Sequence, residues 1–413
     1  MRGARHDGVA VPQKGGSVTG LAEFRRDIAE WFALNAPADW RETVDRLRGQ
    51  EYLDYQRQWL RTLGERGFAA PGIPREWGGG GYTVSEQVVI FEEWSRSGAM
   101  PLPLYYSVSL NHVPHTILAH GTQEQKERYV RDAIRGTVWC QGFSEPGSGS
   151  DLASLRTTAK RQDDHWVIEG QKIWSSGAMF ADHCILLART GSQESRHRGI
   201  TYFLLDMRAE GVDVRPIRQN TGHHEFCEIF LDSVKLPLDS VLGEVDQGWS
   251  VAQTTLETER GPIGMSVIGE IGAGLEMVKK HLATTSPSSV APERAELATL
   301  VARHQAVSAL SADIVDLLNR GAPDGGLSSL MKISFSELLR DLTEFASRLN
   351  GPSELIDPQR PHLTGSVTGD WTLDWLQSWS WTIAGGTNEI QRNIIAERTL
   401  GLPREPRGAK RGA

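Results

Sequence analysis

The sequence has little cysteine, no long apolar run and no excess of positive charge, and each shortage excludes a class of protein. Cys140, Cys184 and Cys227 are the only cysteines in 413 residues, too few and too scattered for a disulfide framework or a metal cluster. No apolar run approaches the roughly 18 residues of a membrane-spanning helix. The formal net charge of −8 argues against nucleic-acid binding, which depends on clustered lysine and arginine. We therefore expect a protein of a reducing compartment, located in the cytoplasm.

The order of periodic segments predicts helices, then strands, then helices again. In "LAEFRRDIAEWFALNAP" the residues Leu21, Phe24 and Ile28 repeat at steps of three and four, as on one face of a helix. Short β-branched segments such as "HCILLART" and "GITYFLLDM" follow Trp139 and are typical of strands joined by hairpins. The fold class expected is α+β. The limits predicted are a flexible leader over 1–20, a helical domain over 21–138, a β-barrel-like domain over 139–240, a four-helix bundle over 241–402 and a flexible tail over 403–413.

Three local details carry their own predictions. Ser85 is the expected N-cap of the helix in "SEQVVIFEEWSRSG". Thr122 with Gln125 has the spacing of a capping box. The glycines of "IPREWGGGGYT" suggest close backbone packing more than a phosphate cradle, since no Walker lysine follows them.

Two further segments could carry chemistry. In "WCQGFSEPGSGSDLASL" the glycines at 147 and 149 let backbone N–H groups converge on a phosphate or on the polar edge of a ring. In "GQKIWSSG" a tryptophan followed by hydroxyls could place an aromatic face and a donor beside a planar cofactor. Taken singly, an ordinary Ser/Gly loop and a core tryptophan explain them as well.

Together with "GGTNEIQRNIIAERTLGLPR", and in this order along residues 20 to 405, these segments resemble the acyl-CoA dehydrogenase family. The resemblance implies that FAD is the cofactor, an acyl-CoA the substrate, and an electron-transfer flavoprotein or similar protein the acceptor. It implies α,β-dehydrogenation, with the α-hydrogen leaving as a proton and the β-hydrogen as hydride to flavin N5. The FAD-binding positions it implies are Gln141, Phe143, Ser144, Gly149, Ser150, Trp174, Ser175, Ser176, Thr387, Asn388 and Glu389. Ser150, Arg260 and Gly386 would contact the substrate.

The catalytic base is absent from its usual place. Most family members carry a glutamate immediately before the "GT" of the C-terminal motif, where this chain has Gly385, preceded by Ala384. The isovaleryl-type and long-chain-type members carry it on an earlier helix, just before an arginine, which matches Glu259 and Arg260 here. Helical spacing puts Glu259 on one stripe with Ala252, Leu256, Ile263 and Val267, whereas Glu257 falls off it. Pro262 has no N–H for the Thr258 carbonyl, which loosens the helix there. A solvated Glu259–Arg260 pair is the alternative.

Two segments that complete the FAD site of a neighbouring subunit in family homodimers also look lost. "TTSPSSVAPE" and "RLNGPSELID" stand where an Arg–Phe–Gly segment and a paired-glycine segment are expected. The chain in this respect resembles subunits of the α2β2 actinobacterial dehydrogenases that act on bulky steroid side-chain CoA thioesters. A related acyl-CoA dehydrogenase subunit is therefore the expected partner. A non-catalytic subunit of such a complex and a flavin oxidase of the same fold remain as alternatives.

Overall fold

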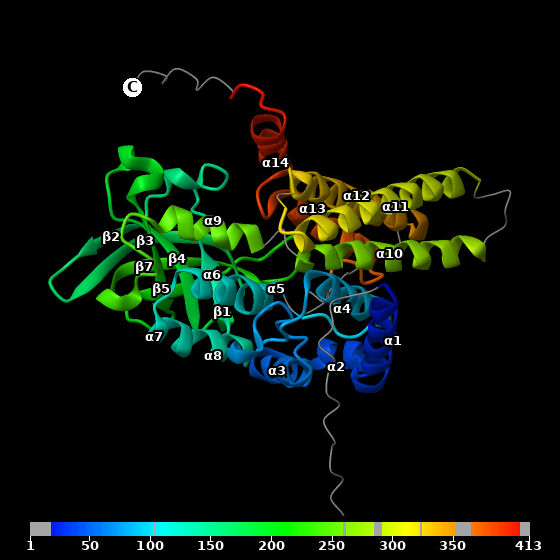
Figure 1. The fold of residues 1–413 in the computed structure, drawn as a ribbon, viewed down its shortest axis with the longest axis horizontal. Helices are drawn as coiled ribbons and strands as arrows, with labels where there is room; N and C mark the ends of the chain where they lie inside the picture. The colour runs from blue at the N-terminus through cyan, green and yellow to red at the C-terminus, as the bar shows by residue number, and fades with distance from the viewer. Residues whose placement is uncertain are drawn as a thin grey trace, which may run out of the picture.

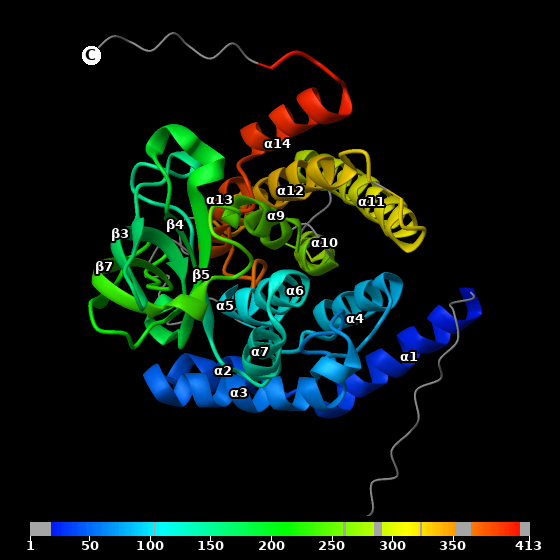
Figure 2. The same ribbon diagram turned by 60° about the vertical axis from the view of Figure 1, so that its left-hand side comes forward.

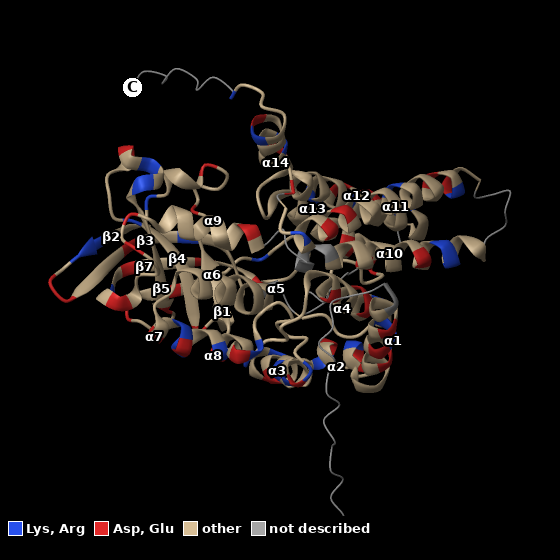
Figure 3. Cartoon of the chain, in the orientation of Figure 1, with Lys and Arg blue, Asp and Glu red and all other residues tan. Residues whose placement is uncertain are grey.

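The computed structural model describes residues 18–102, 104–258, 262–284, 291–322, 324–351 and 365–404. It confirms the α+β class: the strands come between two groups of helices along the chain, and in space the sheet lies to one side of them (Figure 1). Acidic and basic residues are interspersed along the helices (Figure 3). Among the described helices, none is both long and apolar enough to cross a membrane. The predicted domain limits stay a prediction.

The first group of helices packs around an aromatic core that includes Phe32, Trp59 and Phe68. The helix predicted from Leu21 begins three residues earlier, at Val18. The helices of this group are α1 (Val18–Asn35), α2 (Trp40–Arg46), α3 (Gly49–Glu65), α4 (Val84–Ser97), α5 (Leu104–Ser107), α6 (Val113–His120), α7 (Gln123–Gln125) and α8 (Arg131–Ile134). A π-helical turn, Val108–His112, joins α5 to α6.

The local predictions in this region had mixed outcomes. Thr83, not Ser85, caps α4: its hydroxyl accepts from the Glu86 N–H, and Glu86 reaches back to the Thr83 N–H at 2.8 Å. The choice of Ser85 was wrong because it overlooked that Thr83 has a glutamate three residues later. The capping box of Thr122 and Gln125 is confirmed.

The glycine run packs closely, as expected. A Cβ atom on Gly79 would lie 2.2 Å from the carbonyl oxygen of Ile73, and one on Gly80 would lie 2.5 Å from that of Gly67. These glycines therefore allow two stretches of backbone to approach each other.

The strands form one seven-stranded sheet in the order β1-β4-β2-β3-β7-β6, with β5 paired to β4. Their bounds are β1 (Trp139–Gly142), β2 (Thr158–Arg161), β3 (His165–Ser176), β4 (His183–Arg189), β5 (Ile200–Asp206), β6 (Val212–Pro216) and β7 (Phe226–Pro237). β1 runs parallel to β4 and places Cys140 opposite Cys184. Both thiols and that of Cys227 are buried and free. The ladder between β3 and β7 is irregular between Lys172 and Ser175, which matters for the site below.

The second group of helices comprises α9 (Gly248–Thr258), α10 (Pro262–Ala283), α11 (Ala291–Asn319), α12 (Leu327–Asn350), α13 (Trp371–Ile383) and α14 (Asn388–Ile394). Apolar side chains of α10, α11, α12 and α13 share one core. Figures 1 and 2 show α9, α13 and α14 at the end of this bundle that is nearer to the sheet.

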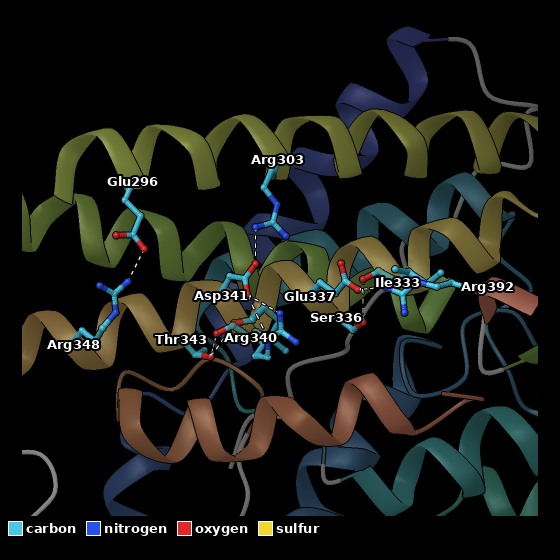
Figure 4. A network of polar contacts seen from close by, with 11 residues as sticks. Glu296, Arg303, Ile333, Ser336, Glu337, Arg340, Asp341, Thr343, Arg348 and Arg392 are labelled. Carbon is cyan, nitrogen blue, oxygen red and sulfur yellow. Dashed lines mark hydrogen bonds and ion pairs between the residues drawn. The ribbon is translucent and has the colours of Figure 1, made fainter. Parts of the chain in front are cut away.

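Helix α12 is joined to its neighbours by ion pairs (Figure 4). Arg303 of α11 contacts Asp341 at 2.7 Å, and Arg392 of α14 contacts Glu337 at 2.5 Å. These side chains are partly exposed, so each pair contributes at most about 1 kcal/mol. Their effect is mainly to orient α11 and α14 on α12.

The stripe predicted around Glu259 begins on one described helix and ends on another. Ala252 and Val267 are both buried, but Ala252 of α9 packs with the sheet and the first helices, whereas Val267 of α10 packs in the bundle. Residues 259–261, between Thr258 of α9 and Pro262 of α10, lie outside the described residues. The place of Glu259 on this stripe therefore stays a prediction. Glu257 is exposed, as expected.

Candidate active site

A buried ion pair fixes the beginning of the loop that follows β1. Lys172 of β3 is fully buried and donates to Glu145 at 2.8 Å and to the Phe143 carbonyl at 3.2 Å. Glu145 also accepts from the backbone N–H groups of Arg156 and Thr157, at 2.6 and 2.8 Å. Both ends of the loop are thereby tied to one carboxylate.

The electrostatics of Glu145 agree with an ion pair. Burial alone would raise its pKa, but the Lys172 ammonium and the hydrogen bonds from Thr157 and Arg156 outweigh burial and hold the pKa below its usual value. Burial lowers the pKa of Lys172, and Glu145 opposes that effect. Each partner therefore favours the charged form of the other. Sequence analysis missed this pair. The signal that could have indicated it is a glutamate within the predicted loop together with a lysine among the apolar residues of a predicted strand.

The outer side of the same loop is open. A Cβ atom added to Gly147 or Gly149 would meet no heavy atom within 4 Å. Ser150 is exposed, and Asp151 pairs with Arg196 at 2.6 Å. Packing within the chain therefore does not explain why glycine stands at positions 147 and 149, whereas close approach of a ligand would.

Trp174 lies beside this loop, at the irregularity of β3. Its φ of 63° is in the left-handed region, rare for a bulky residue, and 57% of it is exposed. The Ile173 N–H donates to the Ser144 carbonyl at 3.0 Å, so the two predicted motifs are adjacent. The indole contacts Phe226 edge to face, at 6.0 Å between ring centroids. A strained, exposed tryptophan is typical of a binding surface.

The two serines after Trp174 differ in burial. The Ser175 side chain is fully buried, and its Oγ has no hydrogen-bond partner within the described part of the chain. Ser176 is half-buried and pairs with Phe226 of β7. A buried hydroxyl without a partner is costly, so this hydroxyl is available to a group that the chain does not itself supply.

Two other predicted cofactor positions, one on β1 and one just after it, differ in burial. Phe143 is 4% exposed and contacts the Tyr202 ring at 5.8 Å. Gln141 is half-buried and pairs with Ile185. Contact of Phe143 with a cofactor stays a prediction and would have to involve its backbone.

The C-terminal turn leads directly into α14. Thr387 caps this helix by accepting from the Ile390 N–H at 3.2 Å. Asn388 is buried, and its side-chain oxygen accepts from Lys332 at 2.8 Å and from Ser336 at 3.2 Å. Asn388 therefore holds α14 on α12.

Gly385 and Gly386 have φ values of 65° and 83°, which a residue with a side chain rarely adopts. Gln391 is buried and donates to the Gly385 carbonyl at 2.7 Å, which braces the turn. The only carboxylate among residues 384–391 is Glu389, and it is exposed and lies 3.6 Å from Arg392. The turn therefore offers backbone N–H groups but no buried carboxylate.

The predicted base and its neighbour, Glu259 and Arg260, lie outside the described residues. The residue before them, Thr258, is described and is held from the first helical group. Asn111 donates to its carbonyl at 3.0 Å, and the His112 ring lies 2.6 Å from its hydroxyl. Sequence analysis recognised from Pro262 that this carbonyl lacks an intrahelical partner, but no pattern pointed to Asn111.

Three family models cover nearly the whole chain: the acyl-CoA dehydrogenase N-terminal domain over residues 23–137, the middle domain over 140–234 and the C-terminal domain over 246–400. Acyl-CoA dehydrogenase IpdE1 of Mycobacterium tuberculosis is 34% identical over 400 residues, covering 94% of this chain and 99% of its own length.

Among solved structures, the Tcur3481-Tcur3483 steroid ACAD superposes with a TM-score of 0.79 at 30% identity, over 94% of this chain and 98% of that one. The ChsE4-ChsE5 complex from Mycobacterium tuberculosis gives a TM-score of 0.77 at 26% identity, over 96% of this chain and 100% of that one. Matches of this extent, together with the order of the three domains, show that the chain belongs to the acyl-CoA dehydrogenase family of oxidoreductases, which are in general FAD-dependent.

Proposed function

We propose that this chain is the catalytic subunit of an FAD-dependent acyl-CoA dehydrogenase in which Glu259 removes the α-proton of the thioester. The observation that carries the proposal is the C-terminal turn, which has two left-handed glycines where a base is usual and no buried carboxylate in the rest of the turn. Glu259 follows directly from the anchored end of α9, and its neighbour Glu257 is solvated. A non-catalytic subunit would not need Glu259 together with the retained segments "SEPGSGSD" and "WSS".

The residues beside β1 and β3 fit a planar cofactor with phosphates. The open side of Gly147 and Gly149 leaves room for a close approach, and Trp174 presents an exposed aromatic face next to it. Ser175 has a buried hydroxyl with a free hydrogen-bonding capacity. FAD bound here would supply an acceptor for the β-hydride. We assign Gln141, Ser144, Gly149, Ser150, Trp174, Ser175, Ser176, Thr387 and Glu389 to its contacts, and we keep Phe143 and Asn388 as backbone neighbours.

The chain's own groups must make the α-proton acidic enough to leave. A backbone N–H of Gly386 or Gly385 polarises the thioester carbonyl, and a donor of this kind contributes about 3–4 kcal/mol to the transition state. Arg260 is a positioning cation near the thioester or the base. A base for such a weak acid must be desolvated so that its pKa rises toward the working pH, and the proposal requires this of Glu259.

The substrate class and the partner follow from two features of the sequence and from the named relatives. Ala384 is small where tyrosine is usual, which leaves space for a bulky or branched acyl chain. The two neighbour-completing segments are absent from the sequence: residues 284–293 and 348–357 stand in their places, and of these 285–290 and 352–357 lie outside the described residues. Two of the similar structures are a steroid ACAD with two named subunits and the ChsE4-ChsE5 complex. We infer a steroid side-chain or similarly bulky CoA thioester, a related partner subunit in an α2β2 complex, a flavoprotein electron acceptor and a cytoplasmic location.

The decisive experiment compares Glu259→Gln with Glu257→Gln in the chain co-expressed with a candidate partner subunit. We expect the first variant to retain FAD absorbance but lose turnover by about 10²–10⁴-fold, which is what general-base catalysis contributes. The second, exposed and two residues away, should act like the wild type. Unchanged turnover of Glu259→Gln in a complex that depends on this chain would show that the chain is a non-catalytic subunit or uses another base.

The oxidase alternative is tested separately. Turnover on a panel of CoA thioesters is measured under two conditions: with an artificial acceptor in the absence of oxygen, and with oxygen as the sole acceptor. A dehydrogenase turns over with the artificial acceptor and hardly at all with oxygen alone. An oxidase would turn over with oxygen alone and release one hydrogen peroxide for each substrate oxidised.

A further inference from the structure

A buried arginine joins the loop that follows β1 to a second loop. Arg189, the last residue of β4, is 5% exposed. Its guanidinium donates four hydrogen bonds, and every acceptor is a backbone carbonyl. The acceptors are the carbonyl oxygens of Ala153 at 2.7 Å, Leu155 at 3.0 Å, Ser192 at 3.1 Å and Arg196 at 3.1 Å. The first two belong to the loop after β1, and the last two belong to the connection between β4 and β5.

This arrangement differs from an ion pair. Buried charges in proteins are usually paired with an opposite charge. Among the described residues, however, no carboxylate lies within hydrogen-bonding distance of the Arg189 guanidinium. A guanidinium carries its N–H donors in a rigid planar fork, so it reaches acceptors on several sides at once. One side chain therefore holds the two loops in a fixed position relative to each other.

The β4–β5 connection makes further contacts with the loop after β1. It contains the 3₁₀ segment Gln193–Gly199. Gln193 donates from its side chain to the Ser154 carbonyl at 3.0 Å. The Arg196 side chain pairs with Asp151 at 2.6 Å. Arg196 also has a φ of 49°, which a residue with a side chain rarely adopts. Such a conformation persists only where the surroundings hold it, and here both the carbonyl and the side chain of this residue are held.

Hydrogen bonds inside the loop after β1 lead from this anchor to its open side. The Ser148 hydroxyl donates to the Asp151 carbonyl at 2.8 Å. The Ser154 hydroxyl donates to the same carbonyl at 2.7 Å and lies 3.3 Å from the Ser148 hydroxyl. Ser148 is 4% exposed and stands between Gly147 and Gly149, whose outer side is open. The described contacts are therefore continuous from the guanidinium to the side of the loop that we assign to FAD.

We propose that Arg189 is a positioning residue for FAD: by holding the β4–β5 connection on the loop after β1, it keeps the open side of that loop in the shape that binds the cofactor. This proposal rests on the proposed function, in which this loop contacts FAD. Arg189 acts through the backbone of the two loops and not by contact with the flavin. A loop that is already in its binding shape binds more tightly than one that must be ordered, because ordering subtracts from the free energy of binding.

The test uses the complex of this chain with its candidate partner subunit and three variants. Arg189→Met keeps the apolar stem and removes every donor. Arg189→Lys keeps the charge, but its donors share one atom and cannot reach carbonyls on several sides. Val234→Ala is the matched control, because Val234 is fully buried on β7 of the same sheet, opposite Ile168. This control should lower the melting temperature through the core of the sheet and not through the two loops.

Four quantities are measured. They are the melting temperature, the affinity for FAD from flavin absorbance, kcat at saturating FAD, and the rate of trypsin cleavage after Arg196 and Arg198. Both arginines are exposed, and their cleavage is followed by mass spectrometry in the FAD-free complex. This last measurement reports on the β4–β5 connection without any cofactor.

We expect both Arg189 variants to weaken FAD binding by about tenfold or more, the cost of ordering freed loop residues on binding. Cleavage after Arg196 and Arg198 should become faster, because the connection is no longer held. The value of kcat at saturating FAD should be retained, since bound cofactor orders the loop again. Val234→Ala should lower the melting temperature and leave the FAD affinity and the cleavage rate unchanged.

Three results would overturn the proposal. The first is an unchanged FAD affinity in Arg189→Met. The second is a loss of affinity in Val234→Ala equal to that in Arg189→Met at the same decrease in melting temperature, which would indicate general destabilisation. The third is full affinity in Arg189→Lys, which would show that the charge matters and the fork does not. Should Arg189→Met fail to fold, Arg189→Lys decides.

Failure of this proposal differs from failure of the proposed function. If Gly147→Ala binds FAD as tightly as the wild type, the loop after β1 is not part of the cofactor site, and both are wrong. If Gly147→Ala weakens FAD binding while Arg189→Met does not, the loop belongs to the site and Arg189 is merely structural.

Discussion

The buried pair of Glu145 and Lys172 allows a prediction with a worked magnitude. Lys172→Met keeps the length and the apolar stem of the side chain but removes the ammonium. Glu145 then remains buried, with the Arg156 and Thr157 N–H groups as its only described partners. Removing one partner of a buried ion pair costs about 3–5 kcal/mol. The two remaining N–H donors place the expected loss of folding free energy near the lower end of that range.

The assay is thermal unfolding of the full chain, followed by FAD binding. An unfolding entropy of about 2.1 cal/mol/K per residue converts 3–5 kcal/mol into a decrease of about 3–6 °C in melting temperature for a chain of this size. The loop from Glu145 to Arg156 should also lose order, so we expect FAD affinity to fall together with the melting temperature. Glu145→Gln should behave similarly, because an amide cannot accept from three donors as a carboxylate does.

The double variant Glu145→Gln, Lys172→Met tests the cause. If an uncompensated charge is responsible, the double variant should be more stable than Lys172→Met alone, because no buried charge remains. A melting temperature of Lys172→Met within 1 °C of the wild type would refute the reasoning. A double variant whose melting temperature falls by the sum of the decreases in the two single variants would refute it as well.

Three further predictions concern other residues of the site. Lowering the pH from 7 to 5 should destabilise the folded chain by about 2 kcal/mol through His112 alone. The pKa of His112 is about 3 in the folded chain, below its unfolded value of 6.5. The neutral ring therefore contributes its full stabilisation above pH 6.5, and this contribution is lost as the pH falls toward 3. Urea unfolding at both pH values should show this loss in the wild type and a smaller loss in His112→Asn. Gly386→Ala should destabilise the turn by about 1–3 kcal/mol and lower kcat, since φ is 83° and the new Cβ would lie 2.9 Å from the Gln391 amide nitrogen. Gly147→Ala should leave the melting temperature of the FAD-free chain unchanged, because its Cβ meets open space, but should weaken FAD binding in an absorbance titration; unchanged FAD affinity would remove the loop from the cofactor site.

The sequence by itself determined the fold class and most of the local structure that positions the site. Apolar spacing over the first helix and alternation in the strands depend only on the geometry of helices and sheets, which is the same in every protein. The cap at Thr122 is equally local, because its donor and acceptor are three residues apart. The absence of a carboxylate at Gly385 and the orphaned carbonyl that Pro262 leaves at Thr258 are also direct consequences of residue type.

Only the tertiary structure decided which distant groups meet these local features. The partner of the Thr258 carbonyl is Asn111, and the partners of Asn388 are Lys332 and Ser336; no periodicity links such residues, which lie about 50 to 150 positions apart. The same holds for Glu145 and Lys172, which meet because β1 and β3 belong to one sheet. A helical pattern likewise records which side chains are buried, but not which of two cores buries them: Ala252 and Val267, both on the stripe predicted through Glu259, pack in different cores.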